Sequence, residues 1–268
     1  MDYELPLRNE NSNKGTFGRV LNISGSDYMP GAAYLSSVSA LTAGCGYVFL
    51  ATEERVIDAV AAQTQNIVFA PLTDIERLLK TADVLLIGCG ISTSKKAENI
   101  FKNALKNAPD IPVIVDADGL NILSEWEKPS LPQKLILTPH VKEASRLLQV
   151  NVEKIIENME FFAKEISKKY NCTTVLKSSE TVVCSKDFKI FHNKKRNSAL
   201  AKAGSGDVLA GIIAGLAAQG LDEFNAAKTG VCIHSLAGEQ AKNDLTEYAV
   251  IAKDQIRYIF SAYKKLLN

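Results

Sequence analysis

Short, nearly continuous apolar runs alternate with longer stretches of helical periodicity over the first half of the chain. Six of these runs predict buried strands, at residues 19–24, 46–51, 66–70, 83–88, 112–117 and 134–138. Continuous apolar runs are typical of parallel strands that are covered on both faces. Helices are predicted between them, for example at 31–44, 73–82 and 92–108. This alternation predicts an α/β fold with a mostly parallel sheet flanked by helices.

The pattern changes after residue 172. Three short, closely spaced β-rich runs predict an antiparallel edge of the sheet, at 172–178, 181–185 and 189–193. Helices are predicted to close the chain at about 205–219, 222–243 and 252–267. No linker, repeat or low-complexity stretch divides the sequence, so residues 1–268 are predicted to form one domain.

Composition does not change the predicted fold class. The 268 residues carry a net charge of +1, so no overall field points to nucleic acid or an anionic membrane as a partner. The five cysteines are scattered without CxxC spacing, which argues against a disulfide framework or a zinc site. The N-terminus lacks a signal-peptide core, and no apolar segment reaches the ~20 residues of a membrane span. We therefore expect a cytoplasmic protein.

The loops after the strands carry most of the chemistry-bearing side chains. In an open α/β sheet, ligands bind outside the carboxyl ends of the strands, where such loops meet. The candidate loops are rich in Gly, Ser, Thr, Asp and His and span residues 24–31, 88–93, 116–121, 138–143, 177–181 and 203–207. Together they predict one composite site. The chain has no Walker A motif and no complete dinucleotide-binding GxGxxG, which argues against those two site types.

The segment AGSGDVLAG places Asp207 directly after Gly204, Ser205 and Gly206, at the start of a predicted helix. Glycines let the backbone approach a ligand closely, and a helix N-terminus favours an anion such as a phosphoryl oxygen. Phosphoryl transfer requires a group that accepts the proton of the attacking hydroxyl, and Asp207 is a candidate for this role. Capping of the helix by the same aspartate explains the motif equally well.

Three further loops each allow a functional and a structural interpretation. Lys177, in LKSSET, either contacts nucleotide phosphates or is the exposed residue of a hairpin. Asp116 and Asp118, in VDADGLN, either orient a metal or substrate or cap the following helix. His140 and Glu143, in LTPHVKE, stand at a strand exit and in a first helical turn, where the dipole favours an acid. The remaining histidines are interpreted as packing or surface residues: His192 and His234.

Taken together, these loops resemble one family, the ADP- or ATP-dependent NAD(P)H-hydrate dehydratases, which have a ribokinase-like fold. The family's early Gly-rich loop is similar to SGSDYMPGAAYL, its GPG turn to IGCGIS and its DADxLN motif to VDADGLN. Its LTPHxxE motif is similar to LTPHVKE, its LKGxxT segment to LKSSET and its GxGDVLAG motif to AGSGDVLAG. The matches run in family order over about residues 14–245, which makes the combination far more specific than any single motif.

The resemblance implies an enzyme that repairs hydrated nicotinamide cofactors. Its substrates would be the (S) hydrates NADHX and NADPHX, in which water has added across a ring double bond. Such an enzyme would phosphorylate the new hydroxyl with ADP, or with ATP, in the presence of Mg²⁺, and would give AMP, phosphate and the repaired NADH or NADPH. The compact chain favours ADP. A homotetramer is also implied, together with a partner epimerase, as a separate chain or as a domain removed from this one.

The same resemblance assigns roles to individual positions. The base near the hydrate hydroxyl corresponds to Asp207. The phosphoryl oxygens would be cradled by Gly204, Ser205 and Gly206, of which Gly206 would also touch the nucleotide. The segment that holds the AMP portion corresponds to Lys177, Ser178, Ser179, Glu180 and Thr181. Contacts to the hydrate correspond to Ala33, Gly90, His140 and Asp207. A Mg²⁺-bound water would be positioned by Glu143.

The chain departs from the family pattern at three positions. Cys89 replaces the usual Pro of the GPG turn, Ser92 a frequent Gly, and Ser178 the usual Gly of the nucleotide segment. None of these changes removes a polar group that the mechanism needs. Two other functions stay open: a ribokinase-like kinase of a vitamin precursor such as hydroxyethylthiazole, and a nucleotide-binding sensor without catalysis.

Overall fold

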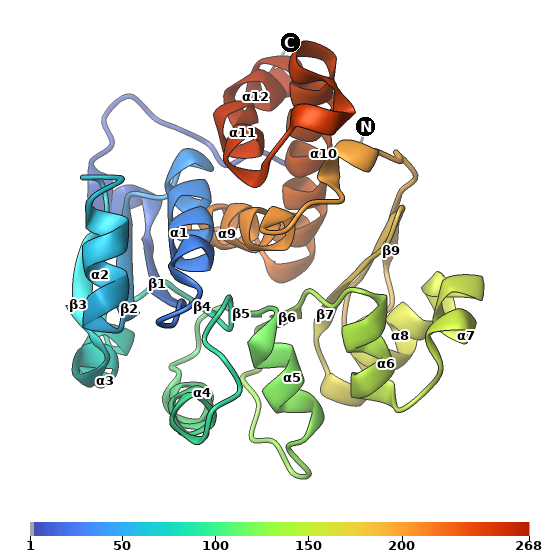
Figure 1. The fold of residues 1–268 in the computed structure, drawn as a ribbon, viewed down its shortest axis with the longest axis horizontal. Helices are drawn as coiled ribbons and strands as arrows, with labels where there is room; N and C mark the ends of the chain where they lie inside the picture. Colours follow the sequence, from blue (N-terminus) through green and yellow to red (C-terminus); the bar gives the residue numbers. More distant parts are fainter. Residues whose placement is uncertain (1–2, 268) are drawn as a thin grey trace.

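A computed structural model describes residues 3–267, so residues 1, 2 and 268 of the predicted domain lie outside the described residues. Within that range the strands form one sheet in the order β3-β2-β1-β4-β5-β6-β7-β8-β9 (Figure 1). The bounds of the strands are β1 Arg19–Ile23, β2 Tyr47–Thr52, β3 Val68–Pro71, β4 Val84–Ile87, β5 Val113–Val115, β6 Leu135–Leu137, β7 Thr173–Lys177, β8 Thr181–Cys184 and β9 Ile190–Asn193.

The pairing of the strands confirms the predicted α/β class with a mostly parallel sheet. Strands β1 to β7 pair in parallel, and β8 and β9 add an antiparallel edge. One detail differs from the prediction, because β7 is antiparallel only to β8 and pairs in parallel with β6. The short turn at 178–180 forces β8 to run back beside β7, whereas the helices between β6 and β7 allow a parallel crossover.

Helices cover both faces of the sheet (Figure 1). One face carries α1 (Pro30–Thr42), α9 (Ser205–Ala218), α10 (Glu223–Ala249), α11 (Ala252–Arg257) and α12 (Ile259–Leu267). The other carries α3 (Ile75–Leu79), α4 (Lys95–Asn107), α5 (Asp118–Ser124), α6 (Val141–Leu148), α7 (Val152–Glu157) and α8 (Met159–Tyr170). The remaining helix, α2 (Glu54–Ala61), packs against α1. Alternate strand residues enter the two cores, which is why the strand runs are apolar throughout.

The helices at the C-terminal end differ in their bounds from the prediction. The helix α10 is kinked at Thr246, which has a non-helical φ of 68°, and a short helical segment after the kink ends at Ala249, beyond the predicted end at 243. The predicted helix 252–267 is divided at Tyr258 into α11 and α12. No helix in residues 3–267 is long and apolar enough to cross a membrane.

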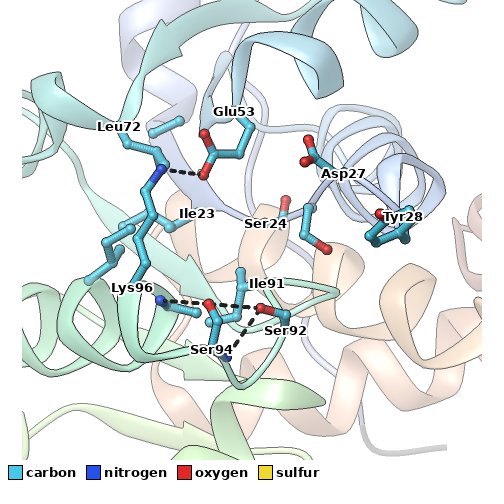
Figure 2. A pocket seen from close by; sticks show the side chains of 15 residues that line it. Ile23, Ser24, Asp27, Tyr28, Glu53, Leu72, Ile91, Ser92, Ser94 and Lys96 are labelled. Carbon is cyan, nitrogen blue, oxygen red and sulfur yellow. Dashed lines mark hydrogen bonds and ion pairs between the residues drawn. The ribbon is translucent and has the colours of Figure 1, made fainter.

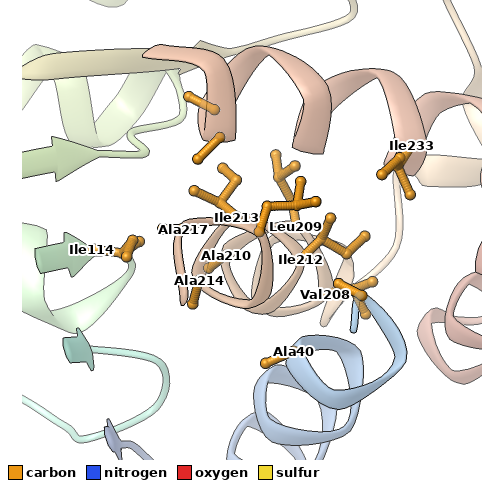
Figure 3. Packing of buried hydrophobic residues seen from close by; sticks show 14 of the residues in the cluster. Ala40, Ile114, Val208, Leu209, Ala210, Ile212, Ile213, Ala214, Ala217 and Ile233 are labelled. Atoms are coloured by element: carbon orange, nitrogen blue, oxygen red, sulfur yellow. The ribbon is translucent and has the colours of Figure 1, made fainter. Parts of the chain in front are cut away.

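Helix α9 is the central helix of one core. Figure 3 shows it between α10 and α1, with Ile114 of β5 beside it. Its close approach to α1 depends on two glycines, because a Cβ at Gly211 would overlap Ser39 Oγ and a Cβ at Gly215 would overlap the Ala40 carbonyl. This packing fixes the axis of α9 relative to the sheet and therefore the place of its N-terminus.

The sheet has a topological switch point at β1. The chain passes from β1 to β2 and β3 on one side and then crosses to β4 on the other side. The loops that leave β1 and β4 therefore diverge at the carboxyl edge of the sheet and leave a crevice between them. The predicted composite site lies along this edge.

Candidate active site

Asp207 lies in the first turn of α9. The residue before the helix is Gly204, which adopts the left-handed conformation with a φ of 87° and leaves α9 without a side-chain cap. Asp207 therefore does not cap this helix, and the capping interpretation of the motif is wrong. The N–H groups of Gly206 and Asp207 in the first turn are therefore not taken up by a side-chain cap and can face an anion, while the Ser205 N–H donates to the Lys202 carbonyl.

The half-buried Asp207 carboxylate forms a cluster with the buried Asp116 and Cys89, and the polar atoms of the three residues lie within 4.8 Å of one another. Asp116 follows β5 and is only 2% exposed. Its Oδ1 accepts hydrogen bonds from Lys177 Nζ at 2.8 Å and from Thr138 Oγ1 at 2.7 Å. Its Oδ2 lies 4.0 Å from the Cys89 thiol. Lys177 thus balances the charge of one of two adjacent carboxylates.

The surroundings of Asp207 tune its proton affinity. Burial, and then the negative charge of Asp116, raise the pKa of Asp207 to about 6, while a hydrogen bond from Cys89 and the charge of Lys177 oppose this rise. Burial also raises the pKa of Cys89 well above its usual value, so this thiol stays neutral and acts as a donor. A carboxylate with a pKa near neutrality both accepts and releases a proton readily, which suits a general base.

His140 and Glu143 cap the start of α6 reciprocally. His140 Nδ1 accepts hydrogen bonds from the N–H groups of Lys142 at 3.0 Å and Glu143 at 3.2 Å, and Glu143 Oε2 accepts one from the His140 N–H at 2.8 Å. Burial raises the pKa of Glu143 to about 7, whereas burial and the charge of Lys177 lower the pKa of His140. Both predicted residues therefore help to shape the exit from β6.

A cavity of about 690 Å³, here called the nucleotide cavity, contains most of the predicted nucleotide segment. Ser178, Ser179 and Thr181 line it together with His140, whereas Glu180 does not and instead pairs with Arg196 at 2.9 Å. The charged residues that line the cavity are all cationic: Lys177, Lys195, Arg196 and Lys202. A basic cavity that reaches a helix N-terminus suits the phosphates of a nucleotide.

Lys177 joins this cavity to the carboxylate cluster. Its side chain is 17% exposed and lines the cavity while Nζ binds Asp116, so it is not the freely exposed hairpin residue of the structural interpretation. Gly206 lies directly against this ion pair, because a Cβ there would be 3.3 Å from Lys177 Nζ and 3.5 Å from Asp116 Oδ2. The start of α9, the cavity and the cluster therefore meet at one point.

Of the four residues predicted to contact the hydrate, His140 lines the nucleotide cavity and Asp207 belongs to the carboxylate cluster, whereas Gly90 and Ala33 lie apart from that cavity. Gly90 has a φ of 64°, and a Cβ there would come within 2.8 Å of Ala32 Cβ. Ala33 is fully buried within α1. The contacts of Gly90 and Ala33 to a hydrate stay predictions. Asp118 does not cap α5, which has no side-chain cap, but accepts a hydrogen bond from Ser92 N at 2.9 Å.

His234 lines the nucleotide cavity and was missed by the sequence interpretation. Its Nε2 lies 3.2 Å from Ser205 Oγ and 3.0 Å from Gln255 Oε1. Burial lowers the pKa of His234 to about 4, so the ring is neutral and supports Ser205 at the start of α9. No sequence signal marks it, because it stands inside an apolar helix. His192, by contrast, pairs with Glu160 at 3.0 Å near the surface, as interpreted.

The carboxylates of the cluster fit a Mg²⁺ ion. Mg²⁺ prefers oxygen ligands and is commonly held by one or two carboxylates together with substrate phosphates. Asp116 and Asp207 supply such oxygens beside the nucleotide cavity, whereas the Cys89 thiol is not a ligand that Mg²⁺ prefers. Glu143 already binds the His140 N–H, and its predicted role toward a Mg²⁺-bound water stays a prediction.

We expect Gly204→Ala to lower the free energy of unfolding by about 2 kcal/mol, because a side chain at this positive φ is strained and its Cβ would also overlap Leu35 Cδ1. Urea unfolding measures the loss. Gly220→Ala is the matched control, since its φ of 99° carries the same backbone strain with no atom within 4 Å of the new Cβ. Equal losses in the two variants would show that Leu35 does not constrain the start of α9.

Comparison with known proteins places the chain in a family. A family model described as NAD(P)H-hydrate dehydratase matches residues 20–260. The ADP-dependent (S)-NAD(P)H-hydrate dehydratase of Neisseria meningitidis is 38% identical over 242 residues, which cover 88% of this chain and 81% of that protein. The chain also matches bifunctional NAD(P)H-hydrate repair enzymes, of which it spans about half the length.

Solved structures agree with this placement. The ADP/ATP-dependent NAD(P)H-hydrate dehydratase of Bacillus subtilis superimposes with a TM-score of 0.88 and 28% identity, covering 97% of this chain and 94% of that one. A ribokinase-like superfamily protein of Enterococcus faecalis gives 0.90 and 27%, covering 97% and 92%. Since the family model spans most of the chain and these folds match over nearly all of it, the chain belongs to the NAD(P)H-hydrate dehydratases, a family of enzymes with a ribokinase-like fold.

Proposed function

We propose that this chain is an ADP-dependent dehydratase of the (S) hydrates of NADH and NADPH. The observation that carries the proposal is the placement of Asp207, a half-buried carboxylate with a pKa of about 6 in the first turn of α9, beside a cavity lined by cations. This arrangement combines a base, anion-binding N–H groups and positive charge, which are the groups that phosphoryl transfer needs. The Neisseria relative is named for this activity.

In the proposed first step, Asp207 accepts the proton of the hydrate hydroxyl as its oxygen attacks the β-phosphorus of ADP. The bond from this phosphorus to the AMP oxygen breaks, and AMP leaves. The ring carbon–oxygen bond then breaks, phosphate leaves with the electron pair, and loss of a proton from the adjacent carbon restores the ring double bond. Phosphorylation comes first because phosphate is a far better leaving group than hydroxide.

The neighbouring residues position the phosphates in this scheme. The N–H groups of Gly206 and Asp207, in the first turn of α9, would hold the transferred phosphoryl group, whereas the Ser205 N–H donates to the Lys202 carbonyl at 3.2 Å. Lys177 places a positive charge between the cavity and the cluster, and His234 holds Ser205 in place. Mg²⁺, which Asp116 would hold beside the nucleotide cavity, would supply further charge neutralisation at the phosphate oxygens and leave Asp207 free to act as the base.

Incubation of the protein with purified hydrate and ADP tests the proposal. We expect the near-ultraviolet absorbance of the dihydronicotinamide to return, with AMP and phosphate formed in equal amounts. Replacing ADP by ATP in the same assay decides the phosphoryl donor. If neither nucleotide restores the absorbance, the dehydratase proposal is wrong and a kinase of another small molecule becomes the better interpretation.

The setting of the enzyme is also a proposal. We infer that residues 1–268 act as one domain and that the enzyme is a homotetramer in the cytoplasm. We also infer that an epimerase supplies the (S) hydrates, either as a separate chain or as a domain not included in this sequence. The five cysteines are buried and free, which is typical of a reducing compartment. The epimerase rests on the family resemblance and on relatives that are bifunctional repair enzymes. Light scattering, which measures the mass of the assembly in solution, tests the homotetramer.

A further inference from the structure

A second cavity, here called the switch-point cavity, opens between the loops that leave β1 and β4. It has a volume of about 300 Å³, at the lower end of the range for small-molecule sites. Figure 2 shows its lining side chains, which come from the ends of β1 and β2 and from the start of α4. The apolar residues that line it are Ile23, Ala51, Leu72, Ile91, Ala97 and Ile100.

The charge of this cavity differs from that of the nucleotide cavity. Its charged lining residues are Asp27, Glu53 and Lys96, two acids and one base. The nucleotide cavity is lined by cations alone among its charged residues. The switch-point cavity is therefore suited to a flat apolar group with hydroxyls at its rim, and it disfavours a phosphate.

Glu53 is the polar side chain best placed to form hydrogen bonds with those hydroxyls. It follows β2 directly and stands before α2, yet it makes no capping hydrogen bond to that helix. Its Oε1 instead accepts a hydrogen bond from Lys96 Nζ at 2.7 Å across the cavity, as Figure 2 shows. In dinucleotide-binding sheets, an acid near the end of the second strand accepts hydrogen bonds from the ribose hydroxyls of adenosine. Glu53 occupies the same topological position beside the same kind of crevice.

The wall between this cavity and Asp207 is thin. Gly25 lines the cavity, and its N–H donates to the Cys89 carbonyl at 2.8 Å, while the Cys89 thiol faces Asp116 and Asp207. Tyr28, which is 91% exposed, stands at the mouth of the cavity with its ring free to stack on a base. The cavity and the carboxylate cluster therefore lie on the two sides of the Gly25–Cys89 contact, a separation that an extended dinucleotide can span.

We propose that the switch-point cavity binds the adenosine half of the dinucleotide hydrate, and that Glu53 accepts hydrogen bonds from its ribose hydroxyls. The enzyme therefore favours the hydrate of NADH over that of NADPH, whose 2′-phosphate would meet Glu53 and Asp27. This inference rests on the proposed function for the identity of the ligand, but the cavity is separate from the cluster around Asp207.

Binding of NADH and NADPH, measured by dihydronicotinamide fluorescence with AMP saturating the nucleotide cavity, tests the inference without requiring turnover. We expect the wild-type protein to bind NADH more tightly than NADPH by about tenfold. Glu53→Gln should remove most of this preference, because it abolishes the repulsion of the 2′-phosphate and releases Lys96 to contact it. Lys96→Met should weaken NADPH binding about threefold relative to the wild-type protein, because it leaves the negative charge of Glu53 without its counter-charge.

Matched controls lie next to each substituted residue. Glu54→Gln and Lys95→Met make the same charge changes at positions that do not line the cavity, and they should leave the NADH to NADPH ratio unchanged. An unchanged ratio in Glu53→Gln would overturn the inference. If the ratio shifts as expected while no hydrate is converted with ADP or ATP, the cavity assignment holds and the proposed function fails. If both hydrates are converted while the ratio does not shift, the proposed function holds and the cavity assignment fails.

Discussion

Asp207→Asn is expected to reduce the turnover number by about 10³-fold, the range that a general base contributes. The amide fills the same space in the cluster but cannot accept the proton of the hydrate hydroxyl. Nucleotide binding should persist, because the cationic side chains of the cavity and the backbone N–H groups at the start of α9 are unchanged. Single-turnover measurements of AMP release, together with an ADP binding titration, separate the two effects.

The pH dependence provides an independent signature of the same residue. The raised pKa of Asp207, about 6, means that the base is ionised above this pH and is lost as the pH falls through it. The rate of phosphoryl transfer should therefore fall about tenfold per pH unit on the acid side, because the fraction of ionised carboxylate falls by that factor. Asp207→Asn should lose this limb of the profile.

Asp187→Asn, an exposed change in the turn between β8 and β9, serves as the control for charge and should leave the rate unchanged. Equal rates for Asp207→Asn and the wild-type protein would remove Asp207 as the base. A wild-type protein that binds nucleotide but never turns over would instead support the non-catalytic sensor.

The fold could be predicted from the sequence because every central strand is buried on both faces. In the strand Val84–Ile87 all four residues are buried, so the run is apolar without alternation, and the helix that follows is marked by its own period. Strand order is a different matter. The pattern of β1 does not show that β4 lies beside it, because that neighbour is set by the crossover and by the packing of helices on the two faces.

The candidate site was predicted in part for the same reason. Asp207 and Lys177 were identified from local motifs, since Asp207 directly follows a loop at the carboxyl edge and Lys177 is the last residue of the strand before another such loop. The partnership of Lys177 with Asp116 was not, because it joins residues 61 apart and depends on β5 and β7 both flanking β6. Glu53 was missed for a similar reason, because only the folded chain shows that its side chain faces the switch-point cavity.

The two cavities divide the chemistry of the proposed reaction between them. The nucleotide cavity gathers cations for the phosphates of the donor, and the switch-point cavity offers an apolar base and a carboxylate for a nucleoside. Cys89 stands between them, with its carbonyl bound to the Gly25 N–H and its thiol beside the carboxylates. The residue that replaces the family's proline therefore connects both halves of the site.

Lys177→Met is expected to have the largest effect on stability, lowering the free energy of unfolding by about 3 kcal/mol because it leaves the buried Asp116 carboxylate without its cation. Although burial alone would lower the pKa of Lys177, the charges of Asp116 and Glu143 raise it above the usual value, so the ammonium is charged in the folded protein. Urea unfolding at neutral pH measures the loss. Activity should fall as well, since the same ammonium lines the nucleotide cavity.

A second variant separates the ion pair from general damage to the fold. Adding Asp116→Asn to Lys177→Met removes the unpaired charge, so the double variant should regain much of the lost stability while staying inactive. Lys134→Met breaks an exposed pair with Asp110, whose side chains are 41% and 75% exposed, and should cost less than about 1 kcal/mol. A loss for Lys177→Met no larger than for Lys134→Met would contradict a structural role for the pair. Restored activity in the double variant would instead contradict a direct role of Lys177 toward the nucleotide.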